Sequence, residues 1–187
     1  MKKINSKGFT LIELLAVITI MGILMLVAIP AVSRTIENSR RDSFADVAKT
    51  YINTIRNAVI ADELECTVGS DTISVSSTDI GAYYFSIDSA NSQNTKDLME
   101  SGGKSSWGNN DVKGYVWWIK SSASSGGFKN TYGIVLVDAQ NHGISSLTPE
   151  ENISRSSVIV NTKNAATPME YSTMSIIPPS SSACTLK

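Results

Sequence analysis

The chain has very few of the side chains on which most enzyme and metal sites depend. Among its 187 residues are one histidine, His142, and two cysteines, and these do not form a cluster with metal-ligand spacing. The sequence also has no glycine-rich loop of the phosphate-binding type and no nucleophile-elbow motif. These absences argue against a metalloenzyme, a nucleotide-dependent enzyme and a serine hydrolase. The sequence therefore predicts no catalytic residue, no cofactor and no metal site.

An excess of charge is missing as well. Lysine and arginine number 16 and the acids 17, so the formal net charge is −1. Nucleic-acid-binding domains carry a strongly basic surface, which this balance does not supply. We therefore expect no specific nucleic-acid site.

What the sequence does have is a long uncharged stretch near its start. Between Leu14 and Ser33 there is no charged side chain, and Glu13 is the one carboxylate just before it. As a helix, residues 9–33 would reach roughly 37 Å, whereas a bilayer's hydrocarbon core is about 30 Å thick. This length predicts that the segment enters a membrane at some stage.

Three interpretations of this segment remain open on residue pattern alone. It has the early lysines of a secretory signal peptide, and Ala31-Val32-Ser33 resembles a cleavage site. It also suits a plain membrane anchor with its lysines held inside the cell. Glu13 favours a third interpretation, because a carboxylate within an apolar membrane segment is costly and usually functional.

The residues from Gly8 to Leu15, GFTLIELL, follow a short leader with three lysines. This stretch resembles the type IV prepilin signature, which type IV pilins share with the pseudopilins of secretion and DNA-uptake machines. Gly8, Phe9 and Glu13 stand where that family has its cleavage glycine, its first mature residue and its acidic residue. The resemblance covers residues 1–61, and beyond them it concerns architecture only.

The resemblance implies a processing pathway. Residues 1–8 would be a leader that a prepilin peptidase removes between Gly8 and Phe9, and the new amino group of Phe9 would be methylated. The mature chain would carry 13 basic and 17 acidic side chains, a net charge of about −4. In a filament, Glu13 would pair with the Phe9 ammonium of a neighbouring subunit, since either charge alone is heavily penalised in an apolar bundle.

The apolar segment is expected to continue as a single long helix. We predict a transmembrane or filament-core helix over residues 9–33 and an amphipathic continuation over residues 34–65. Gly22 and Pro30 are expected to weaken or kink the first part. The second part places apolar residues at steps of three and four, which is typical of one buried helix face. This face comprises Phe44, Val47, Ala48, Tyr51, Ile52, Ile55, Ala58 and Val59.

Beyond Cys66 the composition favours β-structure. The strongest predicted strands are residues 114–121 and 132–138, which are rich in aromatic and β-branched residues. Weaker strands are expected at 72–76, 82–88, 156–161 and 170–177, with a helical turn at 96–101 and an end to regular structure at Pro178-Pro179. We predict an α+β, pilin-like fold, in which a globular head over residues 66–187 supplies an antiparallel meander of three to five strands packed on the helix.

The aromatic and sulfur-containing residues of the head are interpreted mainly as structural. Trp107, Trp117 and Trp118 would fit a sugar site, but tryptophans of a strand are more often core, and the adjacent Trp117 and Trp118 must point to opposite faces. His142 is expected in a turn. The resemblance implies a disulfide between Cys66 and Cys184 that pins the C-terminal tail, the alternative being two free thiols.

Together these features predict a structural subunit and not an enzyme. The chain would be a single-pass precursor in the inner or cytoplasmic membrane, in contact with lipid, and would then enter an extracellular pilus as a helical homo-oligomer. The resemblance implies four partners: other pilins, the prepilin peptidase, an assembly ATPase and its membrane platform protein. Adhesion, twitching motility and DNA uptake all remain open as roles. The alternatives are a pseudopilin of a type II secretion or competence machine, and a secreted or anchored binding protein.

Overall fold

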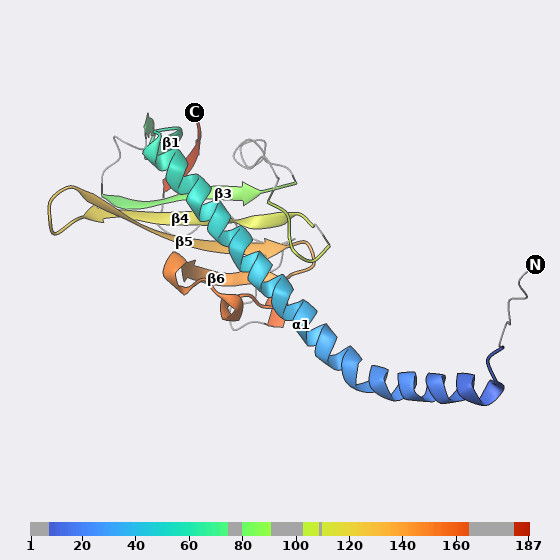
Figure 1. Ribbon diagram of the computed structural model, residues 1–187. Coiled ribbons are helices and arrows are strands. Elements are labelled where there is room, and N and C mark those ends of the chain that lie inside the picture. The colour runs from blue at the N-terminus through green and yellow to red at the C-terminus, as the bar shows by residue number, and fades with distance from the viewer. Residues whose placement is uncertain (1–7, 75–79, 91–102, 109, 165–181) are drawn as a thin grey trace, which may run out of the picture. The chain divides into compact units, whose positions relative to one another are not determined.

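A computed structural model describes residues 8–74, 80–90, 103–108, 110–164 and 182–187 (Figure 1). The chain forms two units, one ending at Ser39 and a larger, compact one from Arg40 to Lys187. A single helix, α1 (Leu11–Ile60), supplies residues to both units. The larger unit adds a seven-stranded sheet to the second half of this helix. The predicted α+β, pilin-like class is therefore confirmed.

The C-terminal end of α1 is defined by an aspartate in the left-handed conformation. Asp62 has φ 57°, and the backbone N–H of Glu63 donates to the carbonyl of Ala58 at 2.9 Å. This is the hydrogen-bond pattern of a Schellman cap, in which glycine is the usual residue and Asp is tolerated. The Asp62 carboxylate also accepts from Ser74 Oγ and Lys187 Nζ. The helix thus ends at Ile60, and the chain turns directly into the sheet. The predicted helical continuation to residue 65 was therefore too long, because Leu64 and Glu65 belong to a strand.

The sheet has the order β2-β1-β7-β3-β4-β5-β6. All neighbouring strands are antiparallel except β3 and β7, which run parallel. Strands β3 to β6 form the expected meander, and the C-terminal strand inserts between β1 and β3. The bounds are β1 (Leu64–Val68), β2 (Asp71–Ser74), β3 (Gly81–Asp88), β4 (Val112–Ser122), β5 (Phe128–Asp138), β6 (Gly143–Pro149) and β7 (Ser182–Leu186). Three short 3₁₀ helices follow β6: η2 (Glu150–Asn152), η3 (Arg155–Ser157) and η4 (Thr162–Asn164).

The hydrophobic core lies between the second half of α1 and one face of the sheet. Phe44, Ala48 and Ile52 are fully buried there, together with strand residues such as Trp118 and Leu136. The predicted amphipathic face is therefore the face that packs on the sheet.

Asp42, near the start of this half, accepts two hydrogen bonds from the Arg155 guanidinium, which lower the pKa of its carboxyl group.

One strand prediction was wrong, and the number of strands was underestimated. Residues 156–161 form no strand: η3 occupies their start, and Ile159 makes only an isolated bridge to Gly143. The sheet has seven strands where three to five were expected, because β1, β6 and β7 are short and polar and become strands through their neighbours. The predicted strand at 72–76 corresponds to β2 as far as Ser74. The predictions at residues 75–76, 96–101, 170–177 and Pro178-Pro179 lie outside the described residues.

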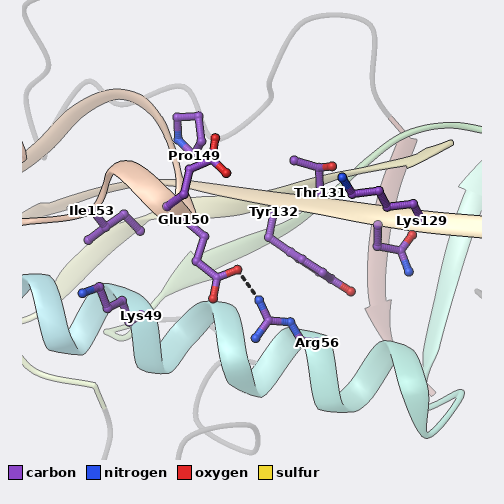
Figure 2. Close-up of a pocket in the computed structure, with 10 residues that line it drawn as sticks. Lys49, Arg56, Lys129, Thr131, Tyr132, Pro149, Glu150 and Ile153 are labelled. Atoms are coloured by element: carbon purple, nitrogen blue, oxygen red, sulfur yellow. Dashed lines mark hydrogen bonds and ion pairs between the residues drawn. The ribbon is translucent and has the colours of Figure 1, made fainter. Parts of the chain in front are cut away.

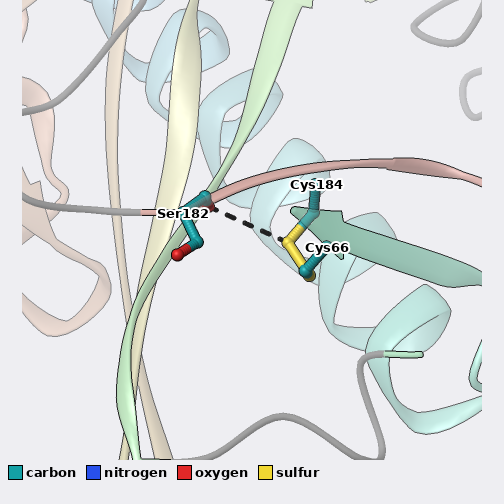
Figure 3. Close-up of a disulfide and its surroundings, with 3 residues drawn as sticks. All are labelled: Cys66, Ser182 and Cys184. Carbon is teal, nitrogen blue, oxygen red and sulfur yellow. Dashed lines mark hydrogen bonds between the residues drawn. A yellow bond between two sulfur atoms is a disulfide. The ribbon is translucent and has the colours of Figure 1, made fainter. Parts of the chain in front are cut away.

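The C-terminal strand is joined to the end of the helix region by a disulfide. Cys66 in β1 and Cys184 in β7 are directly opposite in register, with a Cα–Cα distance of 4.0 Å (Figure 3). Both are buried, and 118 positions separate them in sequence. The bond therefore links the two ends of the sheet-forming chain, and it is the pairing that the resemblance implied.

Removing this disulfide should destabilise the head markedly. Cys66→Ala combined with Cys184→Ala is expected to lower the free energy of unfolding by about 2–5 kcal/mol, since the cross-link closes a long loop in the unfolded chain. Urea unfolding of the full chain in detergent, followed by tryptophan fluorescence, measures this. An unchanged unfolding midpoint would contradict the role given to the bond.

Two glycines of the central strands provide a matched pair of substitutions. A Cβ at Gly114 would lie 1.9 Å from the Val135 carbonyl oxygen, whereas one at Gly133 would lie 3.1 Å from the Thr148 carbonyl oxygen. We expect Gly114→Ala to cost about 1–3 kcal/mol through overpacking, and Gly133→Ala clearly less. Thermal unfolding monitored by circular dichroism distinguishes them, and equal melting temperatures would show the predicted difference to be wrong.

Candidate functional site

The helix α1 begins with a reciprocal hydrogen-bonded cap. The backbone N–H of Thr10 donates to Glu13 Oε2 at 2.8 Å, and the Thr10 hydroxyl donates to the same oxygen at 2.7 Å. In return, the backbone N–H of Glu13 donates to Thr10 Oγ1 at 3.3 Å. This is a capping box, which satisfies backbone groups that a helix start leaves unpaired. The sequence pattern Thr-x-x-Glu signals it, yet the sequence-based interpretation assigned Glu13 to assembly alone.

The cap leaves part of the Glu13 carboxylate unused. Both hydrogen bonds from Thr10 end on Oε2, and within the described residues Oε1 has no partner. Gly8 and Phe9 lie immediately before the capped turn, and the Phe9 side chain is 90% exposed. The predicted cleavage position, the predicted new amino terminus and the single acid of the segment are thus grouped at one helix end.

The first half of α1 carries an apolar surface that the described chain does not cover. None of the residues in the most apolar stretch of α1 is buried. By length and composition the helix can cross a membrane. The large exposed side chains include Leu11, Leu15, Ile18, Met21, Leu24, Val27, Ile29 and Val32.

Gly22 and Pro30 both lie within the regular helix. Pro30 has no N–H to donate, so the carbonyl of Leu26 loses its usual helical partner. A Cβ at Gly22 would meet no atom within 4 Å, so no close contact within the described residues requires glycine there. The expected kink or unwinding at these residues stays a prediction.

The comparisons with known proteins concern this same segment. A family model described as the prokaryotic N-terminal methylation motif matches residues 3–29, which is the type IV prepilin signature. Searches of curated proteins and of solved structures returned no match. The N-terminal region is thus identified by its motif, and this motif with an apolar helix fits a membrane-anchored precursor.

The tryptophans of the head are mostly structural. Trp118 is fully buried between the rings of Tyr83 and Tyr132, at centroid distances of 5.8 and 6.5 Å. Trp117 points to the other face of the sheet, where it packs with Tyr84 and neighbouring apolar residues. The predicted opposite orientation of the two adjacent rings is confirmed. Because Trp107 and Trp118 are core residues, they do not offer a stacking surface to a sugar.

His142 lies in the turn between β5 and β6, as predicted, but it also belongs to a buried network. Its ring stacks on Trp107 at 4.6 Å, and Nδ1 lies 3.1 Å from the fully buried Asp138 carboxylate. Ser105 Oγ donates to the same carboxylate at 2.6 Å. The serine is thus bonded to the acid and not to the imidazole. A serine nucleophile is activated when its hydroxyl bonds to the imidazole and the imidazole bonds to the acid, so this network does not have that arrangement. The network instead ties the chain around Ser105 to the β5–β6 turn.

A pocket of about 520 Å³ lies beside the second half of α1 (Figure 2). Arg56 is fixed there by an ion pair with Glu150, by a hydrogen bond to Asn53 Oδ1 and by its position 4.9 Å above the Tyr132 ring. Burial raises the pKa of Tyr132, and the nearby Arg56 charge opposes this shift. The lining residues are Lys49, Arg56, Lys129, Asn130, Thr131, Tyr132, Pro149, Glu150, Glu151 and Ile153.

The cap at Thr10 can be tested separately from any assembly function. Thr10→Ala removes the side-chain half of the capping box and is expected to destabilise the first helical turn by about 0.5–2 kcal/mol. Amide hydrogen exchange of the full chain in detergent should show faster exchange at residues 11–14. Thr19→Ala, at another exposed threonine that bonds a helix carbonyl, is the control and should leave that turn unchanged. Unaltered exchange in Thr10→Ala would contradict the cap.

Proposed function

We propose that the chain is a structural subunit of a type IV pilus-like filament. The observation that carries this proposal is the uncovered apolar half of α1, whose first turn is capped by Thr10 and Glu13 and follows the glycine of a prepilin signature, Gly8. A surface of this kind is stable in a membrane, or in a bundle made of many such helices. The fully packed head behind it suits a subunit that is displayed outside the cell.

The proposed pathway has three stages. A prepilin peptidase cuts between Gly8 and Phe9 and removes residues 1–8. The new amino group of Phe9 is then methylated, and the helix stays on the mature chain as a membrane anchor. An assembly ATPase and its platform protein finally move the subunit from the membrane into an extracellular filament of identical subunits and other pilins.

Glu13 would have two distinct roles in this pathway. Within its own chain it completes the cap with Thr10, using Oε2. In the filament, its second oxygen would accept the Phe9 ammonium of a neighbouring subunit. Two opposite charges in an apolar bundle attract strongly, whereas a subunit out of register leaves one of them buried and unpaired. The pair would therefore select correctly aligned subunits.

Two substitutions at Glu13 separate these roles. Glu13→Gln keeps a side chain that can complete a capping box but removes the charge, whereas Glu13→Ala removes both. We expect both variants to be processed normally and both to fail to assemble when expressed without the unsubstituted chain. Electron microscopy of sheared filaments and the mass of the processed chain provide the measurements.

Thr10→Ala is the matched control, because it weakens the cap and keeps the charge. It should assemble far better than Glu13→Gln. Efficient filament formation by Glu13→Gln alone would contradict the charge pair while leaving the filament proposal in place. An unsubstituted chain that is processed and forms no filament would contradict the filament proposal itself.

A further inference from the structure

Strand β5 has an open edge next to the Arg56 pocket. Phe128 to Tyr132 pair with β4 on one side, but β6 pairs with β5 only from Gly133 to Val137. The ladder to β6 ends at Pro149, which has no N–H to donate, and η2, which begins at Glu150, contacts β5 without pairing with it as a strand. Within the described residues, the outer side of residues 128–132 has no strand partner. An unpaired edge of this kind is a template for adding a strand from another chain.

The groove along this edge is lined by three basic and two acidic side chains, and the ion pair between Arg56 and Glu150 neutralises one of each. Lys49 on α1 and Lys129 on β5 line it, and neither forms an ion pair within the part of the chain that the structure describes. Arg56 lies between α1 and β5, already oriented by Asn53 and Glu150 (Figure 2). The buried Oδ1 of Asn130, beside this edge, has no hydrogen-bond donor within the described residues.

The far edge of the same sheet has the complementary charge. Strand β2 is the other end of the strand order and pairs only with β1 in the described structure. From Asn57 to Thr95 the sequence has no lysine or arginine. Asp71 in β2 is exposed, Glu65 in β1 is half-buried, and neither forms an ion pair among the described residues.

We propose that β2 of one copy adds to the open edge of β5 in the next copy. The incoming strand would bring Asp71 to the edge that holds Lys129. Its backbone would pair with residues 128–132. This inference rests on the proposed filament function and names a contact between heads in that filament.

The same contact can be repeated from each copy to the next along a filament. The two edges are different surfaces of one molecule, so the contact is heterologous, and each copy keeps one free edge of each kind. A heterologous contact that does not close into a ring generates an open polymer. Four or five paired residues make a small interface, which suits a contact that forms only when the helices already hold the subunits together.

Cysteine cross-linking in filaments tests the contact. Thr72→Cys lies near the middle of β2, and Thr131→Cys is exposed on the open edge of β5. These two positions approach one another whether the added strand runs parallel or antiparallel. Both native cysteines are held in the disulfide, so a short bismaleimide reacts with the new thiols. We expect a ladder of cross-linked chains from the doubly substituted protein.

The control replaces Thr131→Cys by Asn164→Cys, which is exposed in η4 away from the open edge, and should give no ladder. Filaments that form without a ladder would overturn the strand contact and leave the proposed function intact. If the unsubstituted chain forms no filament, the proposed function fails. In that case the contact fails with it, because the contact needs the helices to hold the subunits together.

Charge reversal provides a second readout. Lys129→Glu should reduce the cross-link yield by about tenfold or more, because it faces Asp71 with a like charge. Adding Asp71→Lys in the same chain should restore the yield. Lys163→Glu, a reversal at an exposed lysine in η4, should have no effect. A yield that Lys129→Glu leaves unchanged would overturn the pairing of copies.

Discussion

The first half of α1 exposes large apolar side chains along its whole length, and the described chain offers nothing to cover them. Water is a poor solvent for such a surface, so the segment needs lipid or other helices of its own kind. The bonding of the carboxylate at the helix start follows from this need for an apolar environment. A single carboxylate there is costly in either setting unless it is bonded, and Thr10 provides part of that bonding within the chain. In the proposed filament, the unused oxygen is the part of Glu13 that a neighbouring subunit would reach.

The apolar side chains in the second half of the same helix are covered by the chain itself. Its apolar residues lie on one face, and the sheet buries them in the core of a head that is complete without the first half. The C-terminal strand closes this head by inserting between β1 and β3, where the Cys66–Cys184 bond fixes it. Among the described residues, the strand order ends at β2 and β6, and residues 128–132 of β5 extend beyond the pairing with β6. One chain thus combines an apolar helix that water does not stabilise with a unit that has its own hydrophobic core.

Much of this arrangement is visible in the sequence, and the reasons differ from element to element. The period of Phe44, Ala48, Ile52 and Ile55 predicts the buried helix face because burial imposes that period. Strands β4 and β5 are predicted by their aromatic and β-branched residues. By contrast, β6 and β7 are short and rich in Ser and Thr, so their neighbours decide their structure. The Asp138 network was not foreseen because Ser105 lies 33 positions from its acid. The Thr10 cap could have been found from its Thr-x-x-Glu spacing.

The most direct test of this account is the intact mass and N-terminal sequence of the protein isolated from its native membrane. The account predicts a chain that begins at Phe9, carries a methyl group on its amino terminus and retains the whole of α1. A chain that begins at Arg34 would show that the apolar segment is a discarded signal peptide. A chain that keeps residues 1–8 in cells with an active prepilin peptidase would contradict the account equally.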